Sequence, residues 1–547
     1  MDRIASEELP ENMGQDSECW TRAHAVTAEK LAVAREVLEE MRAGSDLRTA
    51  VEHHPLPGGG SVAKYVLLDE YHRLVAEEGW PEDRAVERTL RTKPIRTLSG
   101  VTTVTGLTKP YPCPGQCIFC PTDVRMPKSY LPDEPGAARA LENGFDPYRQ
   151  VSSRLATYEA LGHPTDKIEL LILGGTWSSY RSDYQRWFVK RCLDAMNGFE
   201  AATLEEAQLA NETAAHRNVG LVVETRPDRI KPRELARLRS LGVTKVQLGA
   251  QSFDDRILEL NGRGHTAAAT LKATTLLRAA GFKIVLHWMP NLYGATLESD
   301  AEDFARMWQD YCPDEIKIYP TQLLEGTPLY DLYRQGRYVP YTTEELINLL
   351  ADVKPSIPRY CRVNRIVRDI PSTHVVEGNR RTSLRQDVQA ELARRGQSCG
   401  CIRCNELRDE RVDPSELRLE DYVYEPAHAE EHFLHYLSPD DKIAGYLRLS
   451  LPRPLEEEDL PPLGFADLED AALIREVHVY GQSLPIGVEA AGAAQHHGLG
   501  TRLLERAAQI ARQAGYRRLA VITAIGTRRY YEARGFRRGE LYMVREL

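Results

Sequence analysis

The sequence has no long hydrophobic run and no export signal. None of its apolar stretches approaches the roughly 18 residues that a membrane-spanning helix needs. The opening segment, MDRIASEELPENMGQD, is polar and acidic, whereas a secretory signal peptide has basic residues followed by apolar ones. We therefore expect a cytoplasmic protein without a membrane segment.

A basic excess is also absent, because the 547 residues carry a formal net charge of −10. Residues 420–470 account for this charge, with fourteen acidic and three basic side chains. Two other stretches are locally basic: residues 88–128 hold seven basic side chains against one acidic, and residues 354–385 hold eight against two. This asymmetry permits a basic groove for nucleic acid, although ordinary solvated surfaces would give the same counts.

The chain is long enough for about two to four packed domains. Helical patterns at 28–42 and 64–79 flank a glycine-rich hinge at 53–61. Further along, short β-rich runs alternate with helical patterns, which predicts parallel strands joined by crossover helices. A doubly wound sheet and a barrel would both give this alternation. The predicted strands are 168–173, 219–223, 244–248, 283–289 and 315–319.

This alternation stops after about residue 390. A short link that contains cysteines comes next, followed by the acidic segment. Residues 471–547 then have the pattern of strand, glycine loop, helix, strand, helix and strand, which predicts a separate α/β domain.

Six of the ten cysteines lie in two tight clusters, which in a cytosolic protein suggests metal binding more than disulfides. In YPCPGQCIFC, the spacing of Cys113, Cys117 and Cys120 suits three irons of a 4Fe-4S cluster and leaves the fourth iron open. Ferredoxin clusters are instead closed by a fourth cysteine. In radical enzymes the open iron chelates S-adenosylmethionine, and electron transfer then yields a 5′-deoxyadenosyl radical. The alternative is a zinc site that borrows a distant ligand.

Residues that could bind this cofactor follow the predicted strands, where a barrel-type sheet places its active site. Glycines at a strand end let the backbone approach a ligand, although such a pair is more often a turn. A carboxylate beside an arginine could bind ribose and carboxylate groups, although a surface ion pair is the simpler interpretation. These candidates for S-adenosylmethionine are Gly174, Gly175, Thr176, Glu224, Arg226 and Gln251.

The second cysteine cluster, C-G-C-x-x-C, is too tight and too far from the strand ends for a second catalytic cluster. Three thiolates and one imidazole would complete a tetrahedral structural zinc site. The nearest upstream histidine is His374, and two others lie downstream, at His428 and His432. A redox centre is the alternative. The predicted zinc ligands are Cys399, Cys401, Cys404 and His374.

A glycine loop with the sequence QHHGLG precedes an amphipathic helix in the C-terminal domain. Backbone N–H groups at a helix N-terminus can bind a pyrophosphate, and the loop resembles that of GNAT acetyltransferases. Tyr531, four residues before Gly535, is a candidate acid for the leaving thiolate, with Tyr530 beside it; both could instead be core residues. The acetyl-CoA candidates are Gln495, His496, His497, Gly498, Leu499, Gly500, Tyr531 and Lys317.

From about residue 60 onward the chain resembles the elongator complex protein 3 family, the catalytic subunits of Elongator. The segments that carry the resemblance include RTKPIRTLSGV (91–101), TKPYPCPGQCIFCP (108–121), ETRPD (224–228) and KIYPTQLLEGTPLY (317–330). The resemblance implies an α/β fold with a partial (βα) TIM-like radical SAM barrel and a C-terminal GNAT-type domain. We assign residues 1–87 to an N-terminal helical region with a candidate tRNA contact, 88–385 to the radical SAM domain, 386–420 to a zinc-binding linker and 421–547 to the GNAT-type domain.

The resemblance also implies a function: placement of a carboxymethyl group on C5 of wobble uridine 34 in tRNA, from acetyl-CoA and S-adenosylmethionine. Lys317 and Tyr319, at a strand end, are candidates to hold the acetyl group or the uridine. An external electron donor and a homodimer are further expectations. The N-terminus lacks a strongly basic tail, so a bacterial-type enzyme fits better than one that depends on Elongator partner subunits. The candidate tRNA contacts are Arg88, Arg91, Lys93, Arg96, Lys109, Arg365, Arg380 and Arg381.

Two other functions remain open from the sequence. One is a protein lysine acetyltransferase with a structural radical SAM domain, in which Glu476 or His478 would be the general base. The other is a tRNA-binding scaffold whose cofactor sites have decayed.

Overall fold

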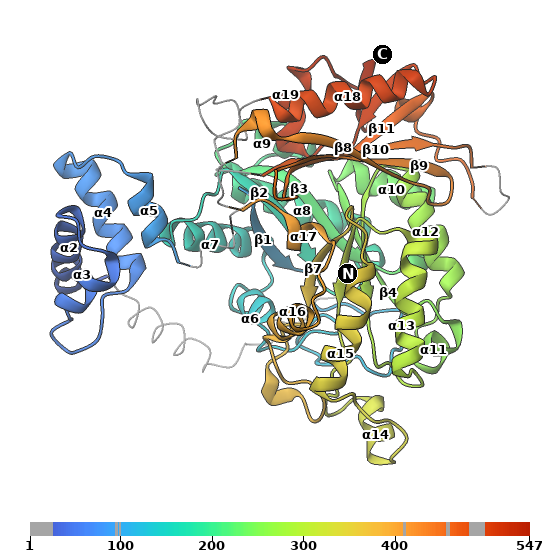
Figure 1. Cartoon of the computed structure of the whole chain (residues 1–547), viewed down its shortest axis with the longest axis horizontal. Coiled ribbons are helices and arrows are strands. Elements are labelled where there is room, and N and C mark those ends of the chain that lie inside the picture. Colours follow the sequence, from blue (N-terminus) through green and yellow to red (C-terminus); the bar gives the residue numbers. More distant parts are fainter. Residues whose placement is uncertain (1–25, 93–96, 98–99, 409–411, 456–459, 481–497) are drawn as a thin grey trace, which may run out of the picture. The chain divides into compact units, whose positions relative to one another are not determined.

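The computed structural model describes residues 26–92, 97, 100–408, 412–455, 460–480 and 498–547 (Figure 1). The chain divides into two compact units. The first comprises residues 1–97 and 153–165, and the second comprises residues 98–152 and 166–547.

The first unit is a small helical bundle. The Thr27 side chain caps its first helix and that of Asp46 caps its second, each accepting from backbone N–H groups of the first turn. The helices bury apolar side chains such as Leu38, Leu67 and Leu74 against one another. They are α2 (Ala28–Arg42), α3 (Leu47–His53), α4 (Lys64–Glu78) and α5 (Arg84–Leu90).

A seven-stranded parallel sheet, called here the barrel sheet, forms the larger part of the second unit. Its strands follow one another in sequence order without a reversal, which excludes the doubly wound alternative. Within the described residues no pairing joins β7 to β1, so the barrel is partial. The strands are β1 (Thr102–Leu107), β2 (Lys167–Leu173), β3 (Arg217–Thr225), β4 (Lys245–Gln251), β5 (Lys283–Trp288), β6 (Glu315–Ile318) and β7 (Arg362–Ile366).

Local signals define the helices between these strands and after the last of them. Thr296 with Ser299 and Thr342 with Glu345 form capping boxes, and Gly198 ends α8 in the left-handed conformation. The helices are α6 (Pro135–Glu142), α7 (Pro147–Ala160, divided between the units), α8 (Ser182–Asn197), α9 (Leu204–Asn211), α10 (Pro232–Ser240), α11 (Asp255–Leu260), α12 (Ala267–Ala279), α13 (Leu297–Arg306), α14 (Pro328–Arg334), α15 (Thr343–Val353), α16 (Leu384–Arg394) and α17 (Ile402–Asn405).

A second seven-stranded sheet, called here the C-terminal sheet, has the order β13-β14-β12-β11-β10-β9-β8. The sequence analysis placed no strand in the acidic segment 420–470, yet three strands lie wholly or largely within it. Helices α18 (Leu499–Gln513) and α19 (Arg528–Glu532) belong to the same domain. Its strands are β8 (Arg418–Tyr424), β9 (Ala429–Leu437), β10 (Ile443–Pro452), β11 (Ala471–Val479), β12 (Arg518–Val521), β13 (Arg537–Arg538) and β14 (Met543–Glu546).

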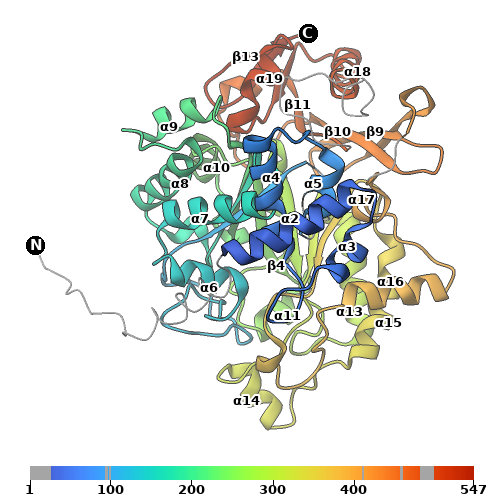
Figure 2. The same cartoon turned by 90° about the vertical axis from the view of Figure 1, so that its left-hand side faces the viewer.

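The C-terminal sheet meets the amino ends of the barrel strands. Residues of β10 and β11 form ion pairs with Lys283, which begins β5, and with Asp314, which precedes β6. In both views α14 and α18 lie at opposite ends of the second unit (Figure 1, Figure 2). The carboxyl ends of the barrel strands therefore face away from the C-terminal domain.

Candidate functional site

The first cysteine cluster lies in the loop that follows the carboxyl end of β1. Hydrogen bonds from Ile118 N to Asn261 O (3.2 Å) and from Leu329 N to Ile118 O (3.0 Å) fix this loop. Arg263 donates to the Cys117 sulfur at 3.2 Å, and the Thr176 hydroxyl lies 3.6 Å from the Cys113 sulfur. The loop is thus fixed by backbone hydrogen bonds, with the Cys117 thiol beside a guanidinium and the Cys113 thiol beside the Thr176 hydroxyl.

Charge and burial both act on these thiols. Burial and the neighbouring Cys117 together raise the pKa of Cys120 to about 11, against the opposing effects of a hydrogen bond with Ser129 and the Arg368 charge. A thiolate is the form that binds iron, and bound metal supplies the charge that stabilises it. Each cysteine of a cubic cluster binds a different iron, so the three sulfurs need not converge on one point.

Two buried polar atoms at the strand ends have no hydrogen-bond partner among the residues that the structure describes, and they suit a polar cofactor. Arg226 donates to Asp228 (2.8 Å) and to Arg263 O (2.7 Å), but its Nη1 makes no hydrogen bond. Gln251, at the end of β4 with a positive φ of 74°, has an unpartnered Oε1. A buried polar atom without a partner is costly unless a ligand satisfies it. Arg226 is therefore a buried group beside the cysteine loop, where a 4Fe-4S cluster and S-adenosylmethionine would fit.

The glycine pair at the end of β2 is required by close packing. A Cβ on Gly174 would lie 1.8 Å from the Thr108 hydroxyl, and both glycines have positive φ, 133° for Gly174 and 72° for Gly175. The turn brings Thr176 to the cysteine loop. The glycine pair therefore forms a tight turn next to the cysteine loop.

A chain of polar side chains crosses the interior of the barrel. Lys317 donates to Gln247 Oε1 at 2.5 Å, and His287 Nε2 lies 2.9 Å from the same oxygen. His287 Nδ1 lies 3.7 Å from Glu224, and its ring is 5.3 Å from that of Tyr319. Burial and the nearby Lys317 charge hold the pKa of His287 well below its usual value, so this histidine is neutral. Burial raises the pKa of Glu224, and Lys317 partly offsets this.

The sequence analysis identified Glu224, Lys317 and Tyr319 but missed the two residues that connect them. Gln247 and His287 each stand inside an apolar strand, VQL and VLHW, where a polar side chain with no partner would be unfavourable. A polar residue inside an otherwise apolar strand was the sequence feature that could have identified each of these two residues.

The second cysteine cluster is compact. The sulfurs of its three cysteines, Cys399, Cys401 and Cys404, lie within 4.8 Å of one another. The fully buried Lys354 donates to the Cys399 sulfur at 3.4 Å, which places a cation beside the thiols. Three thiolates at this separation fit one tetrahedral metal ion such as zinc.

The structure does not bring His374 to this cluster, which corrects the predicted fourth ligand. Its Nε2 lies 2.5 Å from an Asp133 oxygen. His432 bonds to Asp421 (2.8 Å), and His428 bonds to Pro454 O (3.2 Å). Among the described residues, no histidine joins the three cysteines.

We expect the purified protein to contain about one zinc ion per chain, and His374→Ala to retain it. Cys401→Ser is expected to lose the metal, because two thiolates give an incomplete site. Elemental analysis of the desalted proteins measures this. Zinc lost from His374→Ala but kept in Cys401→Ser would reverse the assignment.

Three of the acetyl-CoA candidates, Gly498, Leu499 and Gly500, lie at the start of α18. Gly498 caps this helix in the left-handed conformation, and Leu499 and Gly500 form its buried first turn. A Cβ on Gly500 would lie 2.6 Å from the Tyr530 hydroxyl, which therefore stands beside the loop. Tyr531 is buried and packs against Phe536, with 5.6 Å between the rings. Gln495, His496 and His497 lie outside the described residues.

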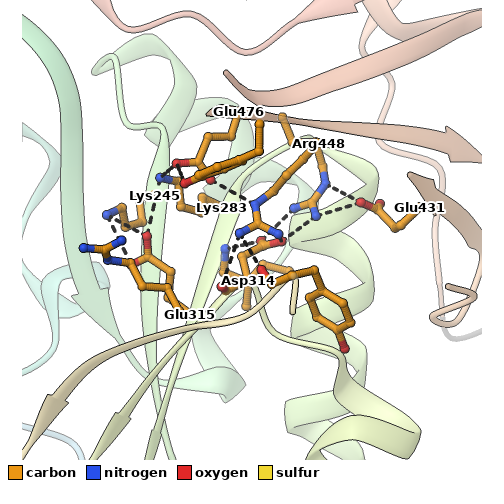
Figure 3. Close-up of polar contacts among 12 residues, drawn as sticks. Lys245, Lys283, Asp314, Glu315, Glu431, Arg448 and Glu476 are labelled. Carbon is orange, nitrogen blue, oxygen red and sulfur yellow. Dashed lines mark hydrogen bonds and ion pairs between the residues drawn. The ribbon is translucent and has the colours of Figure 1, made fainter. Parts of the chain in front are cut away.

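Figure 3 shows the ion pairs that join the C-terminal domain to the barrel. Asp314 accepts from Arg475 at 2.6 and 2.8 Å, and an Arg448 nitrogen lies 3.5 Å away. Arg475 also donates to Glu431 at 2.8 Å. Glu476 accepts from Arg448 (2.9 Å) and from Lys283.

The predicted tRNA contacts are divided between the two units, and the structure describes six of the eight. Arg88 and Arg91 belong to the first unit, where Arg91 donates to Gly162 O at 2.6 Å. In the second unit, Lys109 lies 5.1 Å from the Tyr184 ring and Arg365 pairs with Asp369 at 2.7 Å. Arg380 and Arg381 are exposed, while Lys93 and Arg96 lie outside the described residues.

Sequence and fold comparisons agree with this arrangement. The Radical SAM superfamily model matches residues 111–307, the Radical SAM C-terminal domain model residues 313–394, and the Acetyltransferase (GNAT) family model residues 402–536. These matches confirm the predicted fold class. A radical SAM domain implies a 4Fe-4S cluster and S-adenosylmethionine, and a GNAT domain implies acetyl-CoA. None of the described helices is long and apolar enough to span a membrane.

Whole-chain relatives identify the family. A tRNA uridine(34) acetyltransferase from Dehalococcoides mccartyi is 42% identical over 83% of this chain and 99% of its own. Elongator complex protein 3 from Homo sapiens is 34% identical over 84% of this chain and 86% of its own. The solved structure of the archaeal Methanocaldococcus infernus Elp3 with an N-terminal deletion has a TM-score of 0.70 and 36% identity, covering 82% of this chain and 99% of that one. With both domains and the cysteine loop in place, the chain belongs to the elongator complex protein 3 family.

Proposed function

We propose that this chain is an enzyme that modifies wobble uridine 34 of tRNA, placing a carboxymethyl group on C5. Acetyl-CoA is the carbon source, and an external electron donor reduces the cluster. The observation that carries the proposal is the joining of the two sites: a cysteine loop with unpartnered ligand groups and a GNAT domain belong to one unit, held together by buried ion pairs.

We assign S-adenosylmethionine binding to the carboxyl ends of the barrel strands and acetyl-CoA binding to the C-terminal domain at their amino ends. Cys113, Cys117 and Cys120 would hold the cluster, and the neighbouring Arg226 and Gln251 would bind S-adenosylmethionine. The bound group supplies one-electron chemistry able to remove a hydrogen atom from the acetyl methyl group. Excluding water at these buried strand ends protects that chemistry from side reactions.

Other groups would bind acetyl-CoA and the uridine. The backbone N–H groups at Gly498 and Gly500 would bind the pyrophosphate of acetyl-CoA. Water would attack the thioester carbon to form the carboxylate as the C–S bond breaks, and the Tyr530 hydroxyl would donate a proton to the departing thiolate. Lys317 and Tyr319 would hold the acetyl group or the uridine against Gln247 and His287.

The lysine acetyltransferase alternative lacks a suitable base at the residues considered for it. Burial raises the pKa of Glu476, but the charges of Lys283 and Arg448 outweigh burial and hold the pKa well below its usual value. Burial lowers the pKa of His478 to about 4. Both groups are therefore weak bases at neutral pH, where lysine acetylation needs a stronger one.

The test uses acetyl-CoA that is deuterated at the methyl group. Anaerobic incubation with tRNA, reductant and S-adenosylmethionine is expected to move deuterium into 5′-deoxyadenosine and to yield carboxymethyluridine. A tRNA transcript with cytidine at position 34 is the matched control and should give no modified base. Deuterium absent from 5′-deoxyadenosine would refute the proposal.

A further inference from the structure

A groove with no role in the proposed chemistry opens at the carboxyl end of the barrel. It has a volume of about 440 Å³ and is formed by α11, the loop after β5 and the segment before α15. We call it the Arg–Tyr groove; its walls include Arg256, Leu260, Tyr293, Gly294, Arg337 and Val339. Its volume suits one small molecule or nucleotide, since such pockets measure roughly 300–1,000 Å³.

Two exposed arginines face this groove without an acidic partner. Arg256 donates to Gly294 O at 3.0 Å, and Arg337 donates to the Tyr293 hydroxyl at 3.2 Å. Within the part of the chain that the structure describes, no carboxylate forms an ion pair with either side chain. Arg337 also donates to Gln335 Oε1 at 3.4 Å. Both guanidinium groups are thus oriented by neutral acceptors and keep further donors for an anion.

Apolar and aromatic groups complete the groove. Tyr293 lies 6.0 Å below the Arg337 guanidinium, while Leu260 and Val339 are 40% and 75% exposed. The apolar side chains provide a surface for a flat ring, and a phosphate would suit the arginines. Single-stranded nucleic acids are bound by this combination of stacked aromatic rings and arginines.

The groove is built rigidly. Gly294 has a φ of +88°, and a Cβ there would lie 2.6 Å from Leu260, so that only glycine fits. Tyr338 donates from its hydroxyl to Asn291 O at 2.9 Å, and Asn291 N donates to the buried Asp300 at 2.7 Å. The groove wall therefore needs little ordering when a ligand binds.

One residue ties this groove to the cysteine loop. The Asn261 side chain donates to Tyr293 O (2.9 Å) and accepts from Tyr293 N (3.2 Å). The Asn261 backbone oxygen accepts from Ile118 N, between Cys117 and Cys120. Tyr293, Ile118 and Phe119 also pack against the same hydrophobic cluster. A ligand in the groove would thus be a neighbour of the radical site.

Helix α14 extends the same surface. Its Tyr330 and Tyr333 rings are stacked with 6.3 Å between centroids, and Arg334 donates to the Tyr330 hydroxyl at 3.4 Å. Both tyrosines pack against the hydrophobic cluster that includes Tyr293. Aromatic and arginine side chains therefore continue beyond the groove along a path that a nucleotide strand could follow.

We propose that the Arg–Tyr groove binds a nucleotide flanking the modified uridine in single-stranded RNA, with its phosphate at Arg256 and Arg337 and its base on Tyr293. This assignment rests on the proposed function, because it names a second contact for the same RNA. The groove is separate from the cofactor candidates, since neither Arg226 nor Gln251 lines it. It places the RNA so that one base can reach the strand ends.

The first test measures the salt dependence of tRNA binding for Arg256→Ala/Arg337→Ala. Two lost phosphate contacts are expected to reduce the slope of log K against log salt by about 1.4, since each single-strand contact contributes about 0.7. Arg233→Ala/Arg306→Ala removes the same charge from exposed positions elsewhere and should change the slope little. An unchanged slope in the groove variant would overturn the assignment.

The second test concerns stacking. Tyr293→Ala is expected to weaken tRNA binding by about 10-fold without altering the salt slope, whereas Tyr293→Phe keeps the ring and should bind nearly as wild type. A Tyr293→Phe loss as large as that of Tyr293→Ala would contradict stacking. Unchanged binding of acetyl-CoA and S-adenosylmethionine verifies that each variant is folded.

The outcomes separate the two proposals. If the wild-type protein modifies tRNA while the groove variants bind and modify it equally well, the groove assignment fails alone. If the wild-type protein neither binds nor modifies tRNA, the proposed function and the groove assignment fail together. A photochemical crosslink from Tyr293 to a nucleotide adjoining position 34 would support both.

Discussion

Cys117→Ser is expected to abolish both 5′-deoxyadenosine formation and tRNA modification while acetyl-CoA binding persists. Cys117 is 7% exposed and receives a hydrogen bond from Arg263, so its thiolate would be a buried, charge-stabilised cluster ligand. Serine is a poor iron ligand, and three cysteines leave no spare to replace it. Iron–sulfur absorbance of the anaerobically reconstituted protein and chromatography of the nucleoside products provide the measurements.

Cys192→Ala is the matched control for that variant. Cys192 is likewise a buried free cysteine, but it lies in the middle of α8. It should keep the cluster absorbance and the activity. Full tRNA modification by Cys117→Ser would show that the radical site is dispensable and would favour the acetyltransferase alternative.

Asp314→Ala is expected to destabilise the second unit by about 3–5 kcal/mol, because it leaves buried guanidinium groups without their carboxylate. Asp314, Arg475 and Arg448 are each at most 1% exposed. Asp369→Ala removes an exposed partner of Arg365 and should cost less than about 1 kcal/mol. Chemical denaturation of both variants compares the two losses; equal losses would mean that the buried pairs do not stabilise the domain contact.

The Asp314 carboxylate also makes the contact between the barrel and the C-terminal domain sensitive to acid in the wild-type protein. Burial raises the pKa of Asp314, but the Arg475 and Arg448 charges outweigh burial and hold the pKa far below its usual range. A depressed folded-state pKa means that the stabilisation is present above the unfolded value of about 3.9 and is lost as pH falls toward the folded value. Acidification below about pH 4 should therefore destabilise the wild type more than Asp314→Ala.

Features set by local sequence were predictable. The C-x-x-x-C-x-x-C spacing identified a compact ligand loop, and the apolar runs identified the five strands from β2 to β6. Strands β1 and β7 were missed because TTVTGL and RVNRI are largely polar. Strands β8 and β9 were missed because each carries acidic side chains, although Glu431 of β9 is fully buried and paired with Arg475. Strand β10, IAGYLRLSLP, has no acidic residue and was missed because the segment around it is acidic.

Features set by tertiary contacts were not predictable from spacing. Sequence proximity selected His374 as a metal ligand, yet a distant aspartate, Asp133, binds it. Lys354 contacts the Cys399 sulfur in the fold although the two residues are 45 positions apart in the sequence. Gln247 and His287 can be identified as hydrogen-bond partners only in the fold, because adjacent parallel strands bring their side chains together. The expected tRNA contacts were selected by counting charges along the sequence. Such counts do not show which arginines pair with a carboxylate in the folded protein.

The placement of the C-terminal domain at the amino ends of the barrel strands has a consequence for inhibition. Parallel strands rise about 3.3 Å per residue, so the length of a six-residue strand, about 20 Å, separates the two ends. Under the proposed function, the acetyl group must cross that span past Gln247, His287 and Lys317. A small compound lodged among these side chains would stop carbon transfer without displacing either cofactor. S-adenosylmethionine and acetyl-CoA would both still bind, but the hydrogen atom of the acetyl methyl group could no longer reach the radical site.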